Sequence, residues 1–354
     1  MSNITYEHLS LSNFDISKIP FPNKGDFAES CCFGQNGQMY IPINNKKTCT
    51  IYEYNVSSGT FKVLTTLRSV ILGSCIHGNN LILADSLNRC VILFDVGSGT
   101  IRRFPTVASV ASAASSTAAS STAASSTAAS STAASSTAAS SAFPNDVCYG
   151  DNNTVYVVSN VNYRSKNGIV HRIDLSTGQT SVVMANIYTG CGIQFVDSIL
   201  YVATLMNVIC YNTQTNTSTE ILANSVDRPM YDNVSLLSKD EVCFTIFANN
   251  TEMGHRTMLN PCLRTLLLTA MSATIGVAYF NIYNKDRKMN KRRISFVKYN
   301  TRTRESSYIT FDKRIDAFDN TVTCICSHNE SSYVVINWKA NFLVRMTPKK
   351  TTSI

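Results

Sequence analysis

One short pattern recurs along this chain: an apolar strand ends in Asp or Asn, a Ser/Thr/Gly turn follows, and another strand begins. The copies place the turn residue at Asn55, Asp95, Asp174, Asn212 and Asn300. Asp or Asn at such a turn accepts hydrogen bonds from the backbone that follows, and Gly tolerates a positive φ. A repeated hairpin indicates a repeated structural unit, and the period of that unit determines the fold.

The period is that of a propeller blade. About eleven residues before each hairpin lies another apolar strand, preceded by a polar turn and one more short apolar run. Four antiparallel strands in this order form one blade of a β-propeller. Asn55 and Asp95 lie 40 residues apart, and Asp174 and Asn212 lie 38 apart, near the period of about 40–50 residues expected for a blade. The units number six along the chain.

The fold predicted from this repeat is all-β, a six-bladed β-propeller of four-stranded antiparallel blades. It occupies residues 27–354 and follows an N-terminal segment, residues 1–26. The last blade is expected to end in a hairpin that turns near Thr347 and Pro348. A seven-bladed interpretation would require the apolar residues 254–283 to form a blade, but they lack the alternation of a half-buried strand.

Two inserts interrupt the repeat. Residues 107–142 form a low-complexity Ala/Ser/Thr loop before the third blade, and nothing in it can bury a core. Residues 254–283 form an apolar insert in the fifth blade, where Pro261 and the Leu-rich run after it favour a short helix. Residues 258–279 are expected to cap the channel, with contact to a membrane surface as the alternative.

Composition limits the partners and the compartment. The net charge is +8, and its densest run, residues 285–293, has no interleaved aromatic residues on which bases could stack, so no nucleic-acid partner is expected. No signal peptide or membrane-spanning run is visible, and the 12 cysteines are expected to be buried reduced thiols, which predicts a cytoplasmic protein. A secretory or membrane-associated location is the alternative, because Asn-x-Ser/Thr sequons are present. We expect a monomer that binds a small-molecule substrate or ligand.

The first strand of each blade lines the central channel, and its first residues surround one mouth. Counting back from the second strands gives Glu29, Gly73, Asn145, Cys191, Asp232 with Asn233, and Val322 with Thr323. The oxygen donors among them are Glu29, Asn145, Asp232 and Asn233. Two carboxylates and two amides around one axis suit a hard cation such as calcium, with water completing about six to eight ligands. The alternative is that these residues only end the turns before the strands.

Short motifs follow one another in a set order from about residue 27 to residue 347. They are Ala28-Glu29-Ser30, Leu83-Ala84-Asp85-Ser86, Pro144-Asn145-Asp146-Val147, Gly168 to Asp174, Gly192-Ile193-Gln194-Phe195, Tyr201-Val202-Ala203, Tyr231-Asp232-Asn233-Val234, Ser327-His328-Asn329-Glu330 and Phe342-Leu343-Val344-Arg345. Together they resemble the strictosidine-synthase-like branch of six-bladed propellers, which is related to paraoxonases, arylesterases and the senescence-marker/gluconolactonase family.

The resemblance implies a calcium site at the mouth, held by Glu29, Asn145, Asp232 and Asn233. It implies that Asn145 and Asp232 are catalytic, and that the ion polarises the carbonyl of an ester or lactone. It also implies an incomplete ligand set, because Cys191 stands where the family has Asn and a thiol is a poor calcium ligand.

A second departure from the family concerns its second-blade His, the candidate base. That residue is absent, because Leu72 and Gly73 occupy the stretch. His77 lies farther along the strand and is expected to be structural.

Three functions follow. The first is a calcium-dependent hydrolase of esters or lactones. The second is a catalytically degenerate propeller that binds a small molecule or a protein at the mouth, which Cys191 and the missing base favour. The third is the amine–aldehyde condensation of the alkaloid-forming relatives, which is disfavoured because Val322 and Thr323 offer no carboxylate at the start of the sixth blade.

Overall fold

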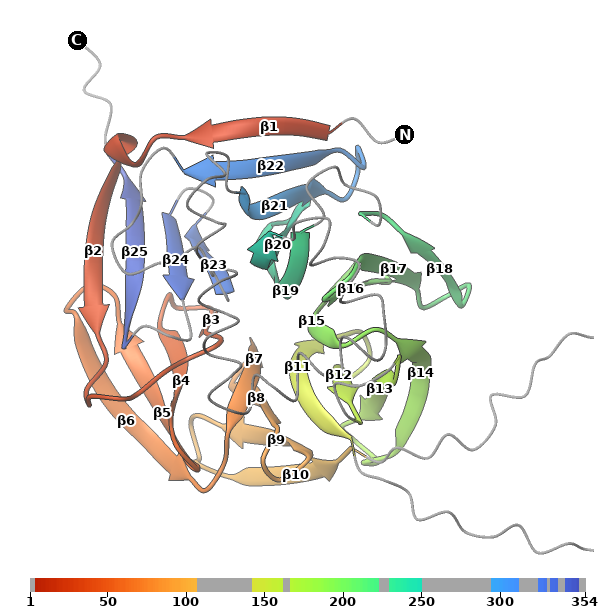
Figure 1. Ribbon diagram of the computed structural model, residues 1–354. Helices are drawn as coiled ribbons and strands as arrows, with labels where there is room; N and C mark the ends of the chain where they lie inside the picture. The colour runs from red at the N-terminus through yellow and green to blue at the C-terminus, as the bar shows by residue number, and fades with distance from the viewer. Residues whose placement is uncertain are drawn as a thin grey trace, which may run out of the picture.

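The fold is a closed ring of six β-sheets around a central axis (Figure 1). The computed structural model describes residues 4–106, 142–161, 166–222, 229–249, 294–311, 324–329, 332–336 and 341–349. Each sheet contains four antiparallel blade strands, so the predicted six-bladed β-propeller is confirmed. The helix expected within residues 254–283 lies outside the described residues, as does the Ala/Ser/Thr tract 107–141.

The first three blades follow the chain in order from the inner strand to the outer strand. Blade 1 contains β3 (Cys32–Phe33), β4 (Met39–Asn45), β5 (Thr48–Asn55) and β6 (Thr60–Leu67). Blade 2 contains β7 (Ile71–His77), β8 (Asn80–Asp85), β9 (Cys90–Asp95) and β10 (Ile101–Pro105). Blade 3 contains β11 (Phe143–Tyr149), β12 (Thr154–Asn160), β13 (Gly168–Asp174) and β14 (Thr180–Ile187).

Blade 4 follows the same order, and the last two blades include strands from both ends of the chain. Blade 4 contains β15 (Gly190–Val196), β16 (Ile199–Thr204), β17 (Val208–Asn212) and β18 (Thr217–Glu220). Blade 5 contains β19 (Pro229–Ser238), β20 (Glu241–Asn249), β21 (Ile294–Asn300), β22 (Ser306–Phe311) and an added edge strand, β1 (Ile4–Leu9). Blade 6 contains β23 (Cys324–Asn329), β24 (Ser332–Ile336), β25 (Phe342–Pro348) and β2 (Phe14–Pro20).

The N-terminal segment closes the ring. β2 pairs antiparallel with β25 as the outer strand of blade 6, and β1 runs parallel to β22 on blade 5 (Figure 1). The hairpin expected near Thr347 and Pro348 is therefore wrong: Thr347 pairs with Asp15, and its strand ends at Pro348. Between β1 and β2 lies a short 3-10 helix, η1 (Leu11–Asn13), whose Leu11 packs into the core between blades 5 and 6.

The repeated turn has the physical basis predicted for it. Asn55 Oδ1 accepts hydrogen bonds from the backbone N–H groups of Ser57 and Ser58, each at 2.9 Å. The same pair of bonds forms at Asp95, Asp174, Asn212 and Asn300. The residue four positions later has a φ between 56° and 75° in every copy, and these residues are Gly59, Gly99, Gly178, Asn216 and Arg304.

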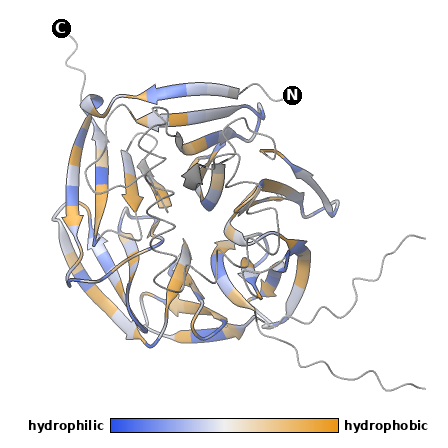
Figure 2. Cartoon of the chain, in the orientation of Figure 1, coloured by the Kyte–Doolittle hydropathy of each residue, from blue (hydrophilic) through white to orange (hydrophobic). Residues whose placement is uncertain are grey.

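The hydrophobic core lies between adjacent blades. Six clusters of buried apolar side chains each join two neighbouring sheets, so every blade is packed on both faces. The outer strands alternate between hydrophobic and hydrophilic residues, as Figure 2 shows for β2 and β6. No helix of the described residues is long and apolar enough to span a membrane.

Candidate functional site

The inner strands share an irregularity where they begin to line the channel. Pairing with the second strand skips Asn145 in β11 and Cys191 in β15. It skips Leu72 in β7, and it skips both Asp232 and Asn233 in β19. A β-bulge adds a residue to one strand and re-aims its side chain, and bulges are frequent at functional sites. The expected mouth residues of blades 3 to 5 are therefore the bulged residues of their strands.

The bulges correct one expected position. Gly73 occupies the same paired register as Asp146 and Gly192 in the neighbouring blades. The blade 2 counterpart of Asn145 is thus Leu72, not Gly73. The count back from the second strand placed the blade 2 position one residue too far along β7. The sixth pair, Val322 and Thr323, lies outside the described residues.

Two asparagines fix the strands just before their bulges. Asn44 Nδ2 donates to the carbonyl oxygen of Ile71 at 2.7 Å, and Asn44 Oδ1 accepts from the Ile71 N–H at 2.9 Å. Asn160 makes the same pair with Gly190, with both bonds at 2.9 Å. Ile71 and Gly190 each directly precede a bulged residue. These buried bonds between blades hold the mouth backbone in place.

Two glycines let the inner strands approach one another at the mouth. A Cβ on Gly73 would lie 2.2 Å from Asp146 Oδ1 and 2.4 Å from Asp146 Cα. A Cβ on Gly192 would lie 2.4 Å from the Val234 nitrogen and 2.6 Å from Asn233 Cα. Only glycine fits at such separations, because the neighbouring atoms are largely backbone. The close packing brings the inner strands of blades 2 and 3 together at the mouth, and likewise those of blades 4 and 5.

Three carboxyl groups from alternate blades converge there: Glu29, Asp146 and Asp232. Burial, and then the charges of Glu29 and Asp146, hold the pKa of Asp232 well above its usual range. Burial raises the pKa of Glu29 to about 7 and that of Asp146 to about 8. Within the described chain, no basic side chain contributes to any of these shifts. The mouth therefore gathers three buried carboxyl groups whose charged forms no basic side chain of the described chain stabilises.

The two amides also lie at this mouth. Asn233 is buried, and its Nδ2 donates to the backbone oxygen of Glu29 at 3.2 Å, which joins blade 5 to blade 1. The Asn233 N–H donates to Thr245 Oγ1 at 2.9 Å. Asn145 is half-buried at the bulge of β11. Of the residues predicted from the sequence, the structure brings Glu29, Asp232 and Asn233 into one another's surroundings.

Sequence reasoning did not select Asp146. This side chain is 6% exposed, and its Oδ2 accepts a hydrogen bond from the Ile193 N–H of the next blade at 2.9 Å. The signal that could have found it is Gly73, since a glycine in a strand interior often marks the close approach of another backbone.

The thiol of Cys191 is part of the same surroundings. Burial, followed by the charges of Asp232, Glu29 and Asp146, raises its pKa, and its Sγ donates to the Thr189 oxygen at 3.6 Å. His77 stacks on Tyr149 with a ring separation of 3.7 Å, and both side chains line the central cavity, so the structural role expected for His77 stays a prediction.

The mouth suits a cation in part. Carboxylate and amide oxygens are hard ligands, whereas Leu72 and Cys191 add no oxygen donor. Among the described residues, the three carboxyl groups do not form a set with all ligand atoms within 4.8 Å of one another. A calcium ion would therefore contact part of the set directly and the rest through water, as calcium sites commonly do.

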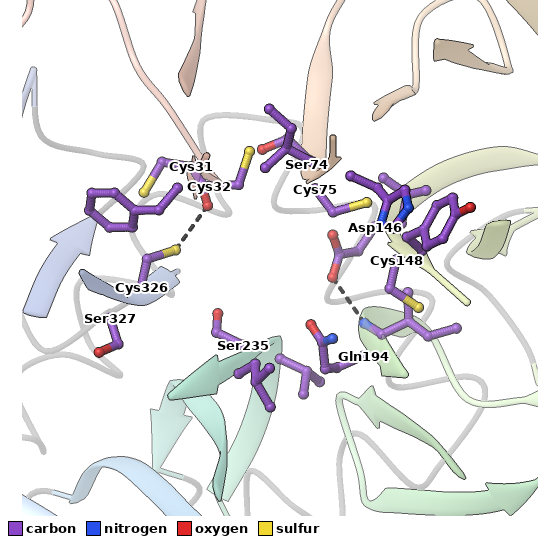
Figure 3. Close-up of a pocket in the computed structure, with 18 residues that line it drawn as sticks. Cys31, Cys32, Ser74, Cys75, Asp146, Cys148, Gln194, Ser235, Cys326 and Ser327 are labelled. Atoms are coloured by element: carbon purple, nitrogen blue, oxygen red, sulfur yellow. Dashed lines mark hydrogen bonds between the residues drawn. The ribbon is translucent and has the colours of Figure 1, made fainter. Parts of the chain in front are cut away.

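A cavity of about 360 Å³ lies among the inner strands, and Asp146 is one of the residues that line it (Figure 3). Its walls are the inner strands beyond the bulges, where pairing is regular. One position in each blade faces this space, and it pairs with the third residue of the second strand in blades 2 to 6 and with the second residue in blade 1. These six residues are Cys32, Cys75, Cys148, Gln194, Ser235 and Cys326. All 11 described cysteines are free thiols.

Comparison with known proteins shows the fold. No protein-family model matches the sequence, and no curated protein matches it. Similar solved structures include a luciferin-regenerating enzyme (TM-score 0.55, 11% identity, 95% of this chain and 96% of that chain covered). Another is a protein proposed to be a gluconolactonase (TM-score 0.56, 8% identity, 96% and 93% covered).

A third similar structure is the calcium-binding protein regucalcin from Agrobacterium tumefaciens strain C58, with a TM-score of 0.54, 9% identity, and 96% and 95% of the two chains covered. Each of these alignments covers nearly the whole of both chains, although the sequence identity is very low. The chain therefore shares the architecture of six-bladed propellers of the gluconolactonase and regucalcin type.

Proposed function

We propose that this propeller is a calcium-dependent hydrolase of esters or lactones, with its metal at the channel mouth. Glu29, Asn145, Asp232 and Asn233 would hold the ion, and Asp146 lies beside them. One observation carries the proposal: three carboxyl groups from three blades crowd together in a buried position without a basic partner in the described chain. A divalent cation would offset their repulsion and their desolvation.

The chain supplies the binding and the orientation. A calcium ion bound here would act as a Lewis acid on the carbonyl oxygen of the substrate. Asn145 and Asp232, both on bulges, are the side chains that would orient that carbonyl and the attacking water. The cavity below is within the size range of small-molecule sites. Ser74, Gln194 and Ser235 on its wall offer hydrogen bonds to the rest of the substrate.

Two further lines support the proposal. A protein proposed to be a gluconolactonase and a calcium-binding regucalcin share the fold, although at 8% and 9% identity the likeness extends to the fold alone. The order of the motifs from residue 27 to residue 347 resembles the strictosidine-synthase-like branch. Within that branch, we expect hydrolysis and not amine–aldehyde condensation.

A second function has a specific observation in its favour. Two of the described bulge positions carry Leu72 and Cys191, which are not calcium ligands. A propeller whose ancestral site has decayed would bind a small molecule or a protein at the mouth without turnover. Calcium binding combined with no hydrolysis of any substrate in a broad panel would favour this function.

The test is hydrolysis of a panel of lactones and aryl esters by the purified protein with calcium or with EDTA. We expect turnover that requires calcium and falls by about 100-fold or more in Asp232→Asn, a loss comparable to that of one electrostatic partner in other active sites. Asp151→Asn is the matched control, because Asp151 is exposed in the turn at the opposite end of β11. Equal activity with EDTA, or an equal loss in both variants, would reject the proposal.

A further inference from the structure

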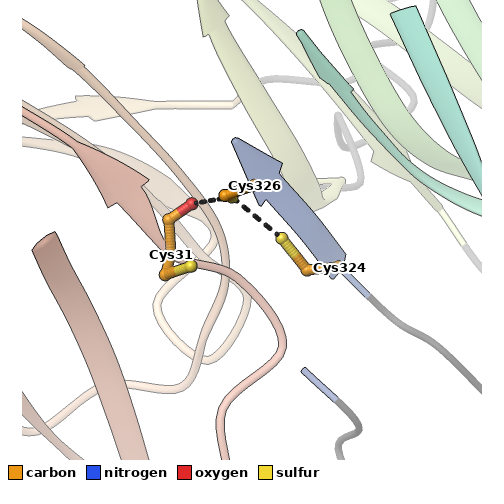
Figure 4. A group of neighbouring side chains, drawn as sticks. All are labelled: Cys31, Cys324 and Cys326. Atoms are coloured by element: carbon orange, nitrogen blue, oxygen red, sulfur yellow. Dashed lines mark hydrogen bonds between the residues drawn. The ribbon is translucent and has the colours of Figure 1, made fainter. Parts of the chain in front are cut away.

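Three thiols meet where the first and last blades adjoin (Figure 4). They belong to Cys31, Cys324 and Cys326, and their Sγ atoms all lie within 4.8 Å of one another. The Cys324 and Cys326 sulfurs are 3.4 Å apart, and Cys326 Sγ donates to the backbone oxygen of Cys31 at 2.8 Å. This cluster, called the thiol trio below, joins residues almost 300 positions apart in the sequence.

Strand geometry explains how the trio forms. Cys324 and Cys326 are two residues apart on β23, so both side chains point to the same face. Ile325 between them packs into the core that joins blades 5 and 6. The two thiols therefore face blade 1, where Cys31 directly precedes β3. The trio is held by the packing of two blades and not by a mobile loop.

The donor set selects a class of metal. Three sulfur atoms with no carboxylate among them suit thiophilic ions such as Zn²⁺ and Cu(I). Calcium is not favoured, because it prefers oxygen ligands. A zinc–sulfur bond of about 2.3 Å places tetrahedral sulfurs about 3.8 Å apart. The Cys324 and Cys326 sulfurs lie 3.4 Å apart, and all sulfurs of the trio lie within 4.8 Å of one another. The expected separation of about 3.8 Å falls between these two distances. Small side-chain shifts would complete the geometry.

A metal ion can reach the trio and displace its protons. Cys31 and Cys326 line the central cavity, which provides access from the channel (Figure 3). Because thiolates and not thiols bind such ions, binding releases protons, and affinity should rise with pH.

We propose that Cys31, Cys324 and Cys326 bind one thiophilic metal ion, Zn²⁺ or Cu(I), that crosslinks the first blade to the last. Three protein ligands leave a fourth position for water or a small thiol on the cavity side. The crosslink joins β23, in the C-terminal part of blade 6, to the start of blade 1, so metal binding adds to the ring closure that the pairing of β2 with β25 provides. This proposal does not rest on the proposed hydrolase activity.

The experiment uses the reduced, metal-free, full-length protein. Zn²⁺ is titrated in competition with a chromophoric chelator, and Cu(I) in competition with a bidentate copper(I) chelator; the tighter of the two is the preferred ion. We expect one tight equivalent in the wild type and in Asp232→Asn. Cys324→Ser and Cys326→Ser should bind at least 100-fold more weakly, since even outer-shell changes cost about 10- to 100-fold. Cys148→Ser, at the same register as Cys326 in blade 3, is the matched control and should bind as the wild type does.

A second measurement needs no variant. Bound Zn²⁺ should slow alkylation of Cys31, Cys324 and Cys326, read by peptide mass spectrometry, and leave the rate at Cys148 unchanged. Equal affinity in wild type and Cys326→Ser, or equal protection of Cys148, would overturn the proposal. A disulfide between Cys31 and Cys326 in mild oxidant, with no metal bound by the reduced form, would overturn it in favour of a redox role.

Discussion

The mouth and the interior of the channel are built from the same six inner strands, yet they have opposite chemistry. At the mouth, β-bulges break the pairing, and Glu29, Asp146 and Asp232 gather carboxyl oxygen donors. In the interior, where pairing is regular, thiols dominate at one register position: Cys32, Cys75, Cys148 and Cys326. Regular alternation selects small side chains that fit a narrow space, whereas a bulge allows a polar side chain to turn toward the opening.

This difference separates two kinds of cation. Hard oxygen donors at the mouth favour calcium, and sulfur donors deeper in the channel favour zinc or copper(I). The two proposals are therefore independent, and a substitution in one region should leave the other unchanged.

The largest expected effect comes from removing the glycine that brings two inner strands together. Gly192→Val should destabilise the fold by about 3 kcal/mol or more, because its Cβ would overlap backbone atoms of Val234 and Asn233. Chemical denaturation measures the change. Gly97→Ala is the control: its Cβ would lie 3.4 Å from the nearest atom, an ordinary contact. A loss below 1 kcal/mol at Gly192 would mean that the mouth strands separate easily.

A smaller effect should appear in the pH dependence of stability with EDTA present. The folded pKa values of Glu29 and Asp146, about 7 and about 8, exceed the ordinary values of 4.5 and 3.8. The folded state therefore binds more protons, and the free energy of unfolding should rise by about 2 kcal/mol as the pH falls from about 8 to about 6.5. Asp146→Asn should remove most of the rise. A flat profile would contradict the burial of these two carboxyl groups.

Below about pH 6.5, a buried histidine far from the mouth acts in the opposite direction. Burial lowers the pKa of His171 from 6.5 to about 4. Its folded form stays neutral while the unfolded chain gains a proton, so stability is lost as the pH falls through this window. Repeating the profile in His171→Leu separates this loss from the gain at the mouth.

The smallest expected effect lies on the outer turns, away from both regions. Arg304 has a φ of 61° where three other copies of the turn have glycine. Arg304→Gly should stabilise the fold by about 1 kcal/mol, because an L side chain is strained in this conformation. Equilibrium denaturation measures the gain. The affinities for calcium and zinc should not change, and a change in either would show that the outer turns are coupled to the channel.

The six blades could be predicted from the sequence because their signals are local. Asn55, Asp95 and their counterparts each satisfy their own turn, so spacing alone reveals the repeat. The closure of the ring could not be predicted, because the pairing of Asp15 with Thr347 depends on how the two ends of the chain meet. A strand's pattern shows which residues face the core but not which edge it will join.

From the sequence, the site residues could be located only by counting back from the second strand of each blade. Glu29, Asp232 and Asn233 were found by spacing, and the structure places them together at the mouth. Leu72 was missed because the count placed the blade 2 position one residue too far along β7, at Gly73. Asp146 and the thiol trio were missed because contacts between blades, which bring Cys31 to Cys326, leave no periodic signal.

The most direct test of the account is thermal unfolding of the wild type, Asp232→Asn and Cys326→Ser, each with calcium and with EDTA. We predict that calcium at about 100 times its Kd stabilises the wild type and Cys326→Ser by about 2.7 kcal/mol, which raises Tm by several degrees, and leaves Asp232→Asn unchanged. Identical melting of the wild type with calcium and with EDTA would contradict the proposed calcium site, as would an undiminished shift in Asp232→Asn.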